Sequence, residues 1–125
     1  MALAVEARER AYAPYSGFAV GAALLGSDGR VWQGCNIENV AFGPTVCAER
    51  VAFFKAVSEG VRAFDAIAIA GGPAGEGIAP FTSPCGVCRQ VMREFCEDGF
   101  RIILGDADGG LRIYTLADLL PASFG

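Results

Sequence analysis

The sequence predicts an α/β fold, a three-layer α/β/α sandwich around a five-stranded mixed sheet. Two observations lead to this prediction. Apolar runs of strand length alternate with amphipathic stretches of helix length, which is typical of a sheet covered by helices on both faces. The last two apolar runs are separated only by a turn, which adds an antiparallel pair. A chain of 125 residues is long enough to bury one core, so we expect a single domain over residues 1–125.

The first half of the fold begins with a helix and a hairpin. Residues 2–12 carry a helical pattern that ends at "APYSG". Residues 18–25, "FAVGAALL", form a continuous apolar run, and "GSDG" at 26–29 is a turn signal before "RVWQGCNI" at 30–37. Two such runs around a turn predict antiparallel strands.

The second half alternates helices and strands. A helix closed by a glycine is followed by an apolar strand and a loop rich in Gly and Pro. In the next helix, Ser83 is a suitable N-cap and Pro84 a suitable first residue. The elements expected here are a helix at about 46–59, a strand at 65–72, the helix that begins after Ser83, strands at 101–105 and 111–115, and a short helix at 116–120.

Composition and charge limit the partners. The formal net charge is -4, and the basic residues are scattered, so we expect no nucleic-acid partner. No apolar run approaches the roughly 18 residues that a membrane span needs, and the first residues lack the pattern of a signal peptide. We therefore expect a cytoplasmic protein without a membrane partner. Because 53% of the residues are hydrophobic, we also expect an oligomer.

The five cysteines, an odd number in a chain expected to be cytoplasmic, indicate metal-binding, catalytic or buried thiols and not a disulfide framework. Histidine is absent, so it cannot be a metal ligand. Cys85 and Cys88 lie three residues apart near the start of one predicted helix, and Cys47 lies at the start of another. Helix N-termini favour thiolates, so these three cysteines predict a zinc site with an open fourth position. Cys35 and Cys96 fit small buried hydrophobic positions, although either could supply a fourth ligand.

Two charged residues, Glu49 and Arg50, come shortly after Cys47 in the predicted helix. Glu49 is two residues further along, so the two side chains point about 200° apart on a regular helix and share a site only if that site lies beyond the helix end. A carboxylate beside a catalytic zinc can accept and return a proton. Arg50 is expected to hydrogen-bond a thiolate and to compensate the negative charge of three thiolates on one Zn²⁺.

The motifs "CNIEN", "CAER" and "PCGVCRQ", with "APYSGFAVGAALL" before them and "LLPASFG" after them, closely resemble the small homotetrameric cytidine deaminases. The resemblance covers nearly the whole chain. It implies one Zn²⁺ per subunit on Cys47, Cys85 and Cys88, with Glu49 moving protons. The implied reaction is the zinc-dependent hydrolytic deamination of cytidine and deoxycytidine to uridine and deoxyuridine, with release of ammonia.

The same resemblance implies the substrate contacts. Asn36 and Glu38 would bind the ribose hydroxyls, and Phe18 would pack against the base. The backbone N–H of Ala48 would point at the base carbonyl. Phe42 occupies a position that is often tyrosine in the family, so a hydroxyl contact is missing there. A carboxylate in the sugar pocket disfavours a nearby phosphate, so nucleosides should be preferred to nucleotides.

A homotetramer with shared active sites is also implied. Phe124, after "LLP", would cover the base in a partner subunit, whereas a tail that docks on its own subunit is the alternative. Three rival functions remain open. They are a redox protein that uses Cys85 and Cys88, a structural zinc module with a fourth cysteine, and a deaminase of a related aminopyrimidine nucleoside such as a nucleoside antibiotic.

Overall fold

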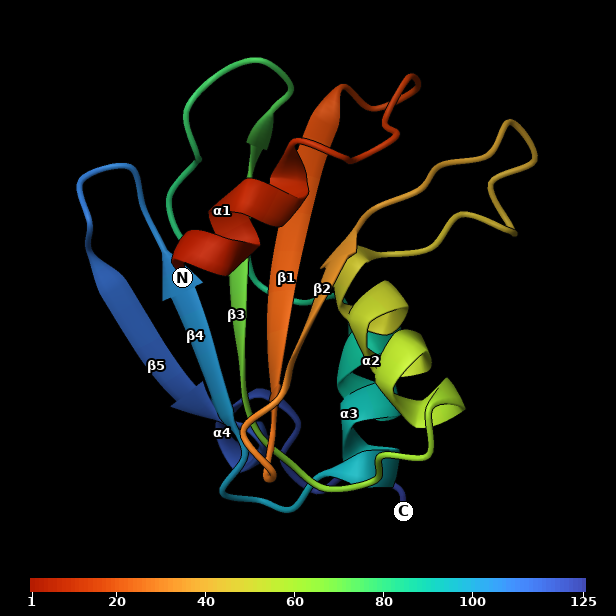
Figure 1. Ribbon diagram of the computed structural model, residues 1–125, viewed down its shortest axis with the longest axis vertical. Coiled ribbons are helices and arrows are strands. Elements are labelled where there is room, and N and C mark those ends of the chain that lie inside the picture. Colours follow the sequence, from red (N-terminus) through yellow and green to blue (C-terminus); the bar gives the residue numbers. More distant parts are fainter.

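The computed structural model describes residues 1–125 as a five-stranded mixed sheet with helices on both faces (Figure 1). The strand order is β2-β1-β3-β4-β5; β3 and β4 are parallel, and the other neighbours are antiparallel. This confirms the predicted fold class. The elements are α1 (Ala2–Arg8), β1 (Phe18–Gly26), β2 (Val31–Cys35), α2 (Ala48–Ser58), β3 (Phe64–Pro73), α3 (Gly86–Phe95), β4 (Arg101–Gly105), β5 (Leu111–Thr115) and α4 (Leu116–Leu119).

Several elements differ in length from the prediction. β2 covers Val31–Cys35 and not residues 30–37. The first helix ends at Arg8 and does not continue to residue 12. The backbone of Tyr12 instead donates to the Asn36 carbonyl and accepts from the Glu38 N–H, and this pairing requires an extended chain. β3 continues to Pro73 because the start of β1 pairs with it, Phe18 opposite Pro73.

The main core lies between the sheet and the helices α2 and α3. Leu24, Ile67 and Ile102 from three strands are completely buried there, together with Met92 of α3. α2 lies directly on β2 at Gly34, where a Cβ atom would collide with the backbone of Ala48 and Ala52. This close contact fixes the start of α2 against the sheet.

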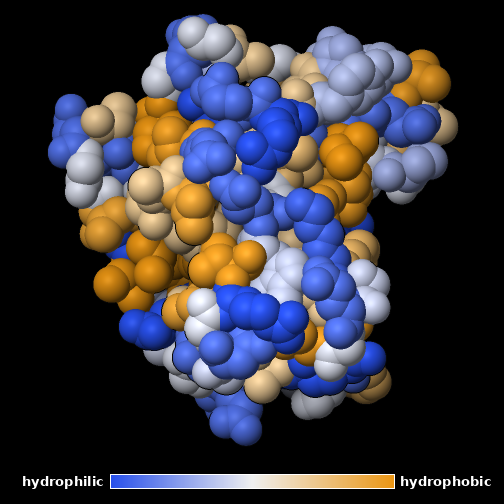
Figure 2. All heavy atoms as spheres, in the orientation of Figure 1, coloured by the Kyte–Doolittle hydropathy of each residue, from blue (hydrophilic) through white to orange (hydrophobic).

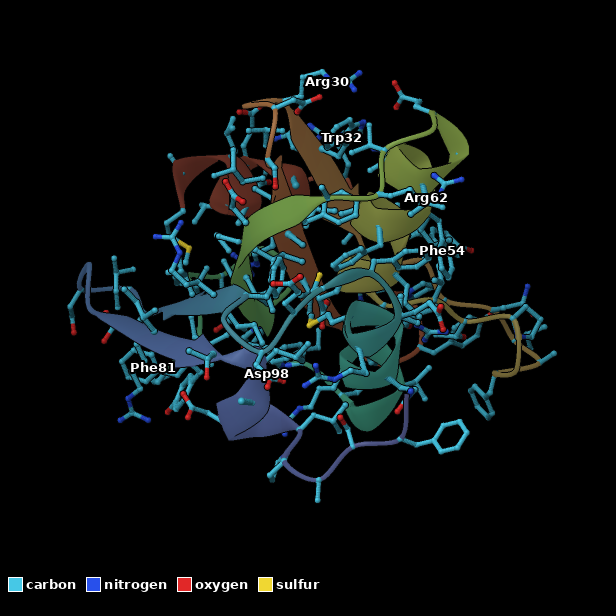
Figure 3. All side chains as sticks on the ribbon, turned by 90° about the horizontal axis from the view of Figure 1, so that it is seen from below. Arg30, Trp32, Phe54, Arg62, Phe81 and Asp98 are labelled. Atoms are coloured by element: carbon cyan, nitrogen blue, oxygen red, sulfur yellow. The ribbon has the colours of Figure 1, made fainter.

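α2 and α3 lie side by side on one face of the sheet (Figures 1 and 3). Phe53 of α2 stacks on Phe95 of α3 with 6.3 Å between ring centroids. The labelled Phe54 is on the outer side of α2 and is half exposed. Both helices begin toward the same end of the sheet, so their N-termini can contribute to one site.

α1 covers part of the other face and leaves an apolar area beside it. α1 packs on β3 through small side chains, Ala4 of α1 and Ala68 and Ala70 of β3. Figure 2 shows apolar residues gathered on this face. Nine apolar residues line a hollow of about 300 Å³ there, namely Met1, Ala2, Leu3, Ala23, Leu25, Val31, Ala66, Ala68 and Ile103. Ile113 of β5 is 61% exposed.

The side chain of Arg8 joins the start of β1 to the end of β3. Its guanidinium group is buried and donates to the carbonyl oxygens of Ala19 (3.0 Å), Gly72 (3.1 Å), Pro73 (2.9 Å) and Glu76 (3.1 Å). These contacts hold the start of β1 to the end of β3 and to the loop that leads toward α3. Separately, none of the four helices is long and apolar enough to cross a lipid bilayer.

Candidate active site

Three cysteine thiols meet where α2 and α3 begin. The Sγ atom of Cys85 lies 3.6 Å from that of Cys47 and 3.5 Å from that of Cys88, and all three lie within 4.8 Å of one another. Tetrahedral coordination with Zn–S bonds of about 2.3 Å requires S···S separations of roughly 3.8 Å. The three thiols therefore have the chemistry and the spacing to hold one zinc ion.

The cysteines reach this arrangement because two of them are helix N-caps. Cys47 precedes α2 with φ -75° and ψ 156°, and Cys85 precedes α3 with φ -69° and ψ 165°. Neither side chain caps its own helix. Each thiol can thus face the space between the helix ends, where the partial positive charge of both N-termini stabilises thiolates.

The predicted start of α3 was wrong. Ser83 was expected to be the N-cap and Pro84 the first helical residue, but α3 begins at Gly86. The extended backbone of Cys85 places its sulfur in the cysteine group. The Ser83 hydroxyl instead accepts a hydrogen bond of 2.8 Å from Arg89, whose Nε also donates to the Pro84 carbonyl.

The thiols differ in their acidity. The pKa of Cys47 is lowered to about 5 because its thiolate accepts a hydrogen bond from the Cys88 thiol and a further one from Arg50. For the same reason, the pKa of Cys88 is raised. Nη2 of Arg50 lies 3.5 Å from Sγ of Cys47, and this thiolate raises the pKa of the guanidinium group. Arg50 therefore contacts the thiolate, as the sequence predicted.

Glu49 is a buried acid next to this group of thiols. It is only 4% exposed, and burial raises its pKa to about 7. The neighbouring Cys47 thiolate is a smaller contributor to the same upward shift of the pKa. Because the site lies beyond the helix end, a residue two positions after Cys47 can still approach it. A carboxyl group that titrates near pH 7 can both accept and donate a proton.

A family model described as "Cytidine and deoxycytidylate deaminase zinc-binding region" matches residues 1–103. The chain belongs to this family. The matched region contains Cys47, Cys85 and Cys88, so the zinc-binding character of this deaminase family agrees with the geometry of the three thiols.

Individual members of the deaminase family match nearly the whole chain. A cytidine deaminase of Sporosarcina psychrophila is 52% identical over 95% of this chain and 84% of its own length. A crystal structure of cytidine deaminase from Burkholderia pseudomallei has a TM-score of 0.89 and 46% identity, and covers 98% of this chain and 94% of that one. A blasticidin-S deaminase of Bacillus cereus is 32% identical over 84% of this chain and 76% of its own length.

Phe18, the residue predicted to pack against the base, lies at the start of β1 in this deaminase fold. A Cβ atom on Gly71 would be 2.9 Å from the Phe18 ring and 2.7 Å from Oγ1 of Thr82. The ring thus lies close to a glycine backbone and near Thr82, which comes three residues before Cys85. A residue larger than glycine at position 71 would have to displace the Phe18 ring or the Thr82 side chain.

Asn36 is buried at the end of β2. Its Oδ1 accepts from the Val20 N–H at 2.8 Å, and its Nδ2 donates to the Phe18 carbonyl at 2.8 Å. The side chain therefore fixes the backbone on both sides of residue 19. One amide hydrogen and one lone pair remain for a ligand hydroxyl.

Glu38 lies two residues further along and binds the loop before β1. Its Oε1 accepts from the backbone N–H groups of Tyr15 and Ser16, both at 3.0 Å, and its Oε2 accepts from the Ser16 hydroxyl. These hydrogen bonds, that of the Ser16 hydroxyl first, lower the pKa of Glu38. A backbone pair between Ile37 and Val46 connects Glu38 to the segment of Cys47.

The other predicted substrate residues are placed differently. Ala48 is fully buried. Because it is the first residue of α2, its N–H is among those at the helix start that lack an intrahelical partner. Phe42 is 73% exposed in the loop between β2 and α2, with a positive φ of 62°. Phe124 is 89% exposed, and its carbonyl accepts from Gln90 of α3. In the single chain both phenylalanine rings are therefore largely exposed to solvent.

The two remaining cysteines lie outside the group of three thiols. Cys96 ends α3 in a buried position, and burial raises its pKa to about 12. Cys35 is half-buried at the end of β2. The geometry thus gives three sulfur ligands from the chain, as a catalytic zinc site requires.

Sequence reasoning missed Ser16, Gly71 and Thr82. Ser16 lies in the segment "APYSG", which was interpreted as the end of a helix and as part of the family resemblance, without a role for the serine. A signal was present, because a serine two residues before Phe18 in a turn can bond to its backbone. For Gly71 and Thr82 no local signal exists, since their proximity to Phe18 depends on strand pairing.

Proposed function

We propose that this chain is a zinc-dependent hydrolase that deaminates cytidine and deoxycytidine to the corresponding uridines, with water consumed and ammonia released. The observation that carries the proposal is the buried Glu49 carboxyl, with a pKa of about 7, beside three convergent thiols. The cytidine deaminases that match nearly the whole chain support the choice of substrate.

The three cysteines, Glu49 and Arg50 would have different roles in the reaction. Cys47, Cys85 and Cys88 would hold the zinc ion, which would supply Lewis acidity and make a water molecule more acidic. Glu49 accepts a proton and later donates one to the departing amino group, for which its pKa near neutrality is suited. Arg50 donates to Cys47 and offsets part of the negative charge of the thiolates.

Recognition of the nucleoside would use both ends of the substrate. Phe18 would pack against the base and the Ala48 N–H would bind its carbonyl oxygen. Asn36 and Glu38 would bind the sugar hydroxyls, since an amide both donates and accepts and a carboxylate accepts. The charge of Glu38 would repel a phosphate on the sugar. We therefore expect nucleosides to be better substrates than nucleotides.

A deaminase of a nucleoside antibiotic is the second candidate, because one relative is a blasticidin-S deaminase. Its identity to this chain, 32%, is lower than the 52% of the cytidine deaminase of Sporosarcina psychrophila. Absorbance assays with cytidine, deoxycytidine, cytidine monophosphate and blasticidin S discriminate between the two. Turnover of the nucleosides but not of blasticidin S supports the proposal, and the reverse pattern overturns it.

We further propose that residues 1–125 act as one domain within a cytoplasmic homotetramer. Two surfaces support an oligomer. They are the apolar hollow beside α1 and the exposed side chain of Phe124, which would reach the substrate of a partner chain. Deleting Ser123 to Gly125 should raise KM and leave the zinc content unchanged. An active monomer in solution, or unchanged kinetics after the deletion, would refute the shared site.

A further inference from the structure

The turn between α1 and β1 binds Glu38 through three donors. The backbone N–H groups of Tyr15 and Ser16 each donate to Oε1 at 3.0 Å, and the Ser16 hydroxyl donates to Oε2. Both carboxylate oxygens are therefore fixed in direction. Oε1 already accepts two hydrogen bonds, whereas Oε2 accepts one and keeps a lone pair for another donor.

The Ser16 hydroxyl has a second partner, which fixes its direction. Its oxygen accepts from the backbone N–H of Phe18 at 3.0 Å. A backbone N–H can only donate, so the hydroxyl acts there as the acceptor and keeps its own proton for Glu38. A single hydroxyl thus connects the carboxylate predicted to bind the sugar with the residue predicted to pack against the base.

A hollow lies next to this connection. Tyr15, Ser16, Glu38, Phe42 and Thr45 line a hollow of about 310 Å³. Glu38 supplies the only negative charge among these residues, and its pKa is lowered by its bonds to Ser16 and Tyr15. The hollow therefore presents an ionised, oriented acceptor, which is the group that binds hydroxyl donors most strongly.

We propose that Ser16 is a positioning residue that sets nucleoside specificity. Its hydroxyl holds the Glu38 carboxylate in the orientation that accepts a sugar hydroxyl, and it ties that orientation to the position of Phe18. The enzyme thereby recognises base and sugar as one rigid unit. This inference rests on the proposed function, since it concerns how the same site selects a nucleoside.

The alternative role for Ser16 is stabilisation of the turn alone. The two backbone N–H groups that bind Oε1 remain in a Ser16→Ala variant, so the turn keeps two of its three bonds to Glu38. What the variant loses is the bond to Oε2 and the bond from the Phe18 N–H. A purely structural role predicts lower thermal stability with little change in KM, whereas the positioning role predicts the opposite.

The test compares zinc-loaded parent, Ser16→Ala, Ser16→Thr, Glu38→Gln and the double variant Ser16→Ala/Glu38→Gln, with cytidine as substrate. Ser16→Ala should raise KM roughly 3- to 10-fold, the worth of one hydrogen bond, with kcat within twofold and zinc content unchanged. Ser16→Thr should restore most of the loss. In the Glu38→Gln background, Ser16→Ala should add less than twofold, because its effect acts through the carboxylate.

Three results would overturn the inference. They are an unchanged KM in Ser16→Ala, a loss in kcat or zinc that accompanies a lower melting temperature, or a full and independent loss in the Glu38→Gln background. Failure of the proposed function gives a different result, since the parent itself would not convert cytidine. In that case the substitutions at Ser16 have no nucleoside kinetics to alter, and the specificity role falls with the substrate.

Discussion

The first turns of α2 and α3 begin alike and then diverge. Each helix has a cysteine N-cap in an extended conformation, Cys47 for α2 and Cys85 for α3. Two positions after the cap, α2 carries Glu49, which is 4% exposed, and α3 carries Val87, which is 58% exposed. Three positions after the cap, α2 carries Arg50 and α3 carries Cys88.

The difference follows from how each helix rests on the sheet. α2 lies directly on Gly34 of β2, and the second residue after its N-cap, Glu49, is buried. In α3 the same position faces outward, and the third position, Cys88, is fully buried. One motif, a cysteine N-cap, thus serves two purposes. α3 provides two of the three thiols that are positioned to hold a metal ion, and α2 provides one thiol together with a buried acid and an arginine.

The largest expected effect on zinc content and activity comes from removing the cysteine N-cap that the two helices share. Cys47→Ala and Cys85→Ala should each lose bound zinc and reduce activity to background, because two thiolates cannot hold the ion as three do. Zinc per chain, measured by mass spectrometry of the metal, checks this. Cys35→Ala is the matched control and should retain zinc. Full zinc content in Cys47→Ala would show that α2 contributes no ligand.

The next largest effect concerns the second residue after each cysteine N-cap, Glu49 in α2 and Val87 in α3. Glu49→Gln should keep zinc and fold but lose roughly 10²- to 10⁴-fold in kcat, because the amide cannot carry the proton. Val87→Gln, at the same position of α3, should change kcat less than twofold since Val87 is exposed. Steady-state kinetics on zinc-loaded proteins measure both. Near-normal turnover by Glu49→Gln would remove the proton-transfer role.

A smaller effect is expected at Arg50, which contacts the thiolate of Cys47. Arg50→Ala should lower kcat/KM roughly 10- to 100-fold, as loss of a partner to a metal ligand commonly does. Metal should remain largely bound. A variant that matches the parent in both rate and zinc content would mean that Arg50 is an ordinary surface arginine.

The smallest effect on activity is expected at the arginine of α3. Arg89 donates to the carbonyls of Pro84 and Leu119 and to the Ser83 hydroxyl, and not to a thiolate. Arg89→Ala should destabilise the fold by about 1–3 kcal/mol, because it leaves partly buried acceptors without partners. It should change kcat less than threefold. Thermal unfolding and kinetics separate the two arginines, and a larger kinetic loss at Arg89 than at Arg50 would contradict the comparison.

Much of the fold could be predicted from the sequence because its signals are local. The apolar runs and the turn at residues 26–29 predicted the strands, and cysteines near helix starts predicted the metal ligands. The rest depended on contacts between distant segments. The chain pairing at Tyr12 shortened the first helix, and the proximity of Phe18 to Thr82 depends on the pairing of β1 with β3.

The start of α3 shows where local rules were insufficient. Ser83 and Pro84 satisfy the usual preferences for a helix N-terminus, yet the helix begins two residues later. Local propensity is outweighed here because Arg89 binds the Ser83 hydroxyl and the Cys85 thiol takes its place in the cysteine group. Likewise, the burial of Glu49 could not be predicted, since the helix pattern alone did not reveal the contact at Gly34.

The central claim is that two cysteine-capped helix N-termini hold one zinc ion with three thiolates and leave one position open. X-ray absorption at the zinc edge of the purified protein tests it most directly. The account predicts three sulfur neighbours at about 2.3 Å and one lighter neighbour, oxygen or nitrogen, at about 2.0–2.2 Å. Four sulfur neighbours would contradict it, because a fourth cysteine would then close the site and leave no position for water.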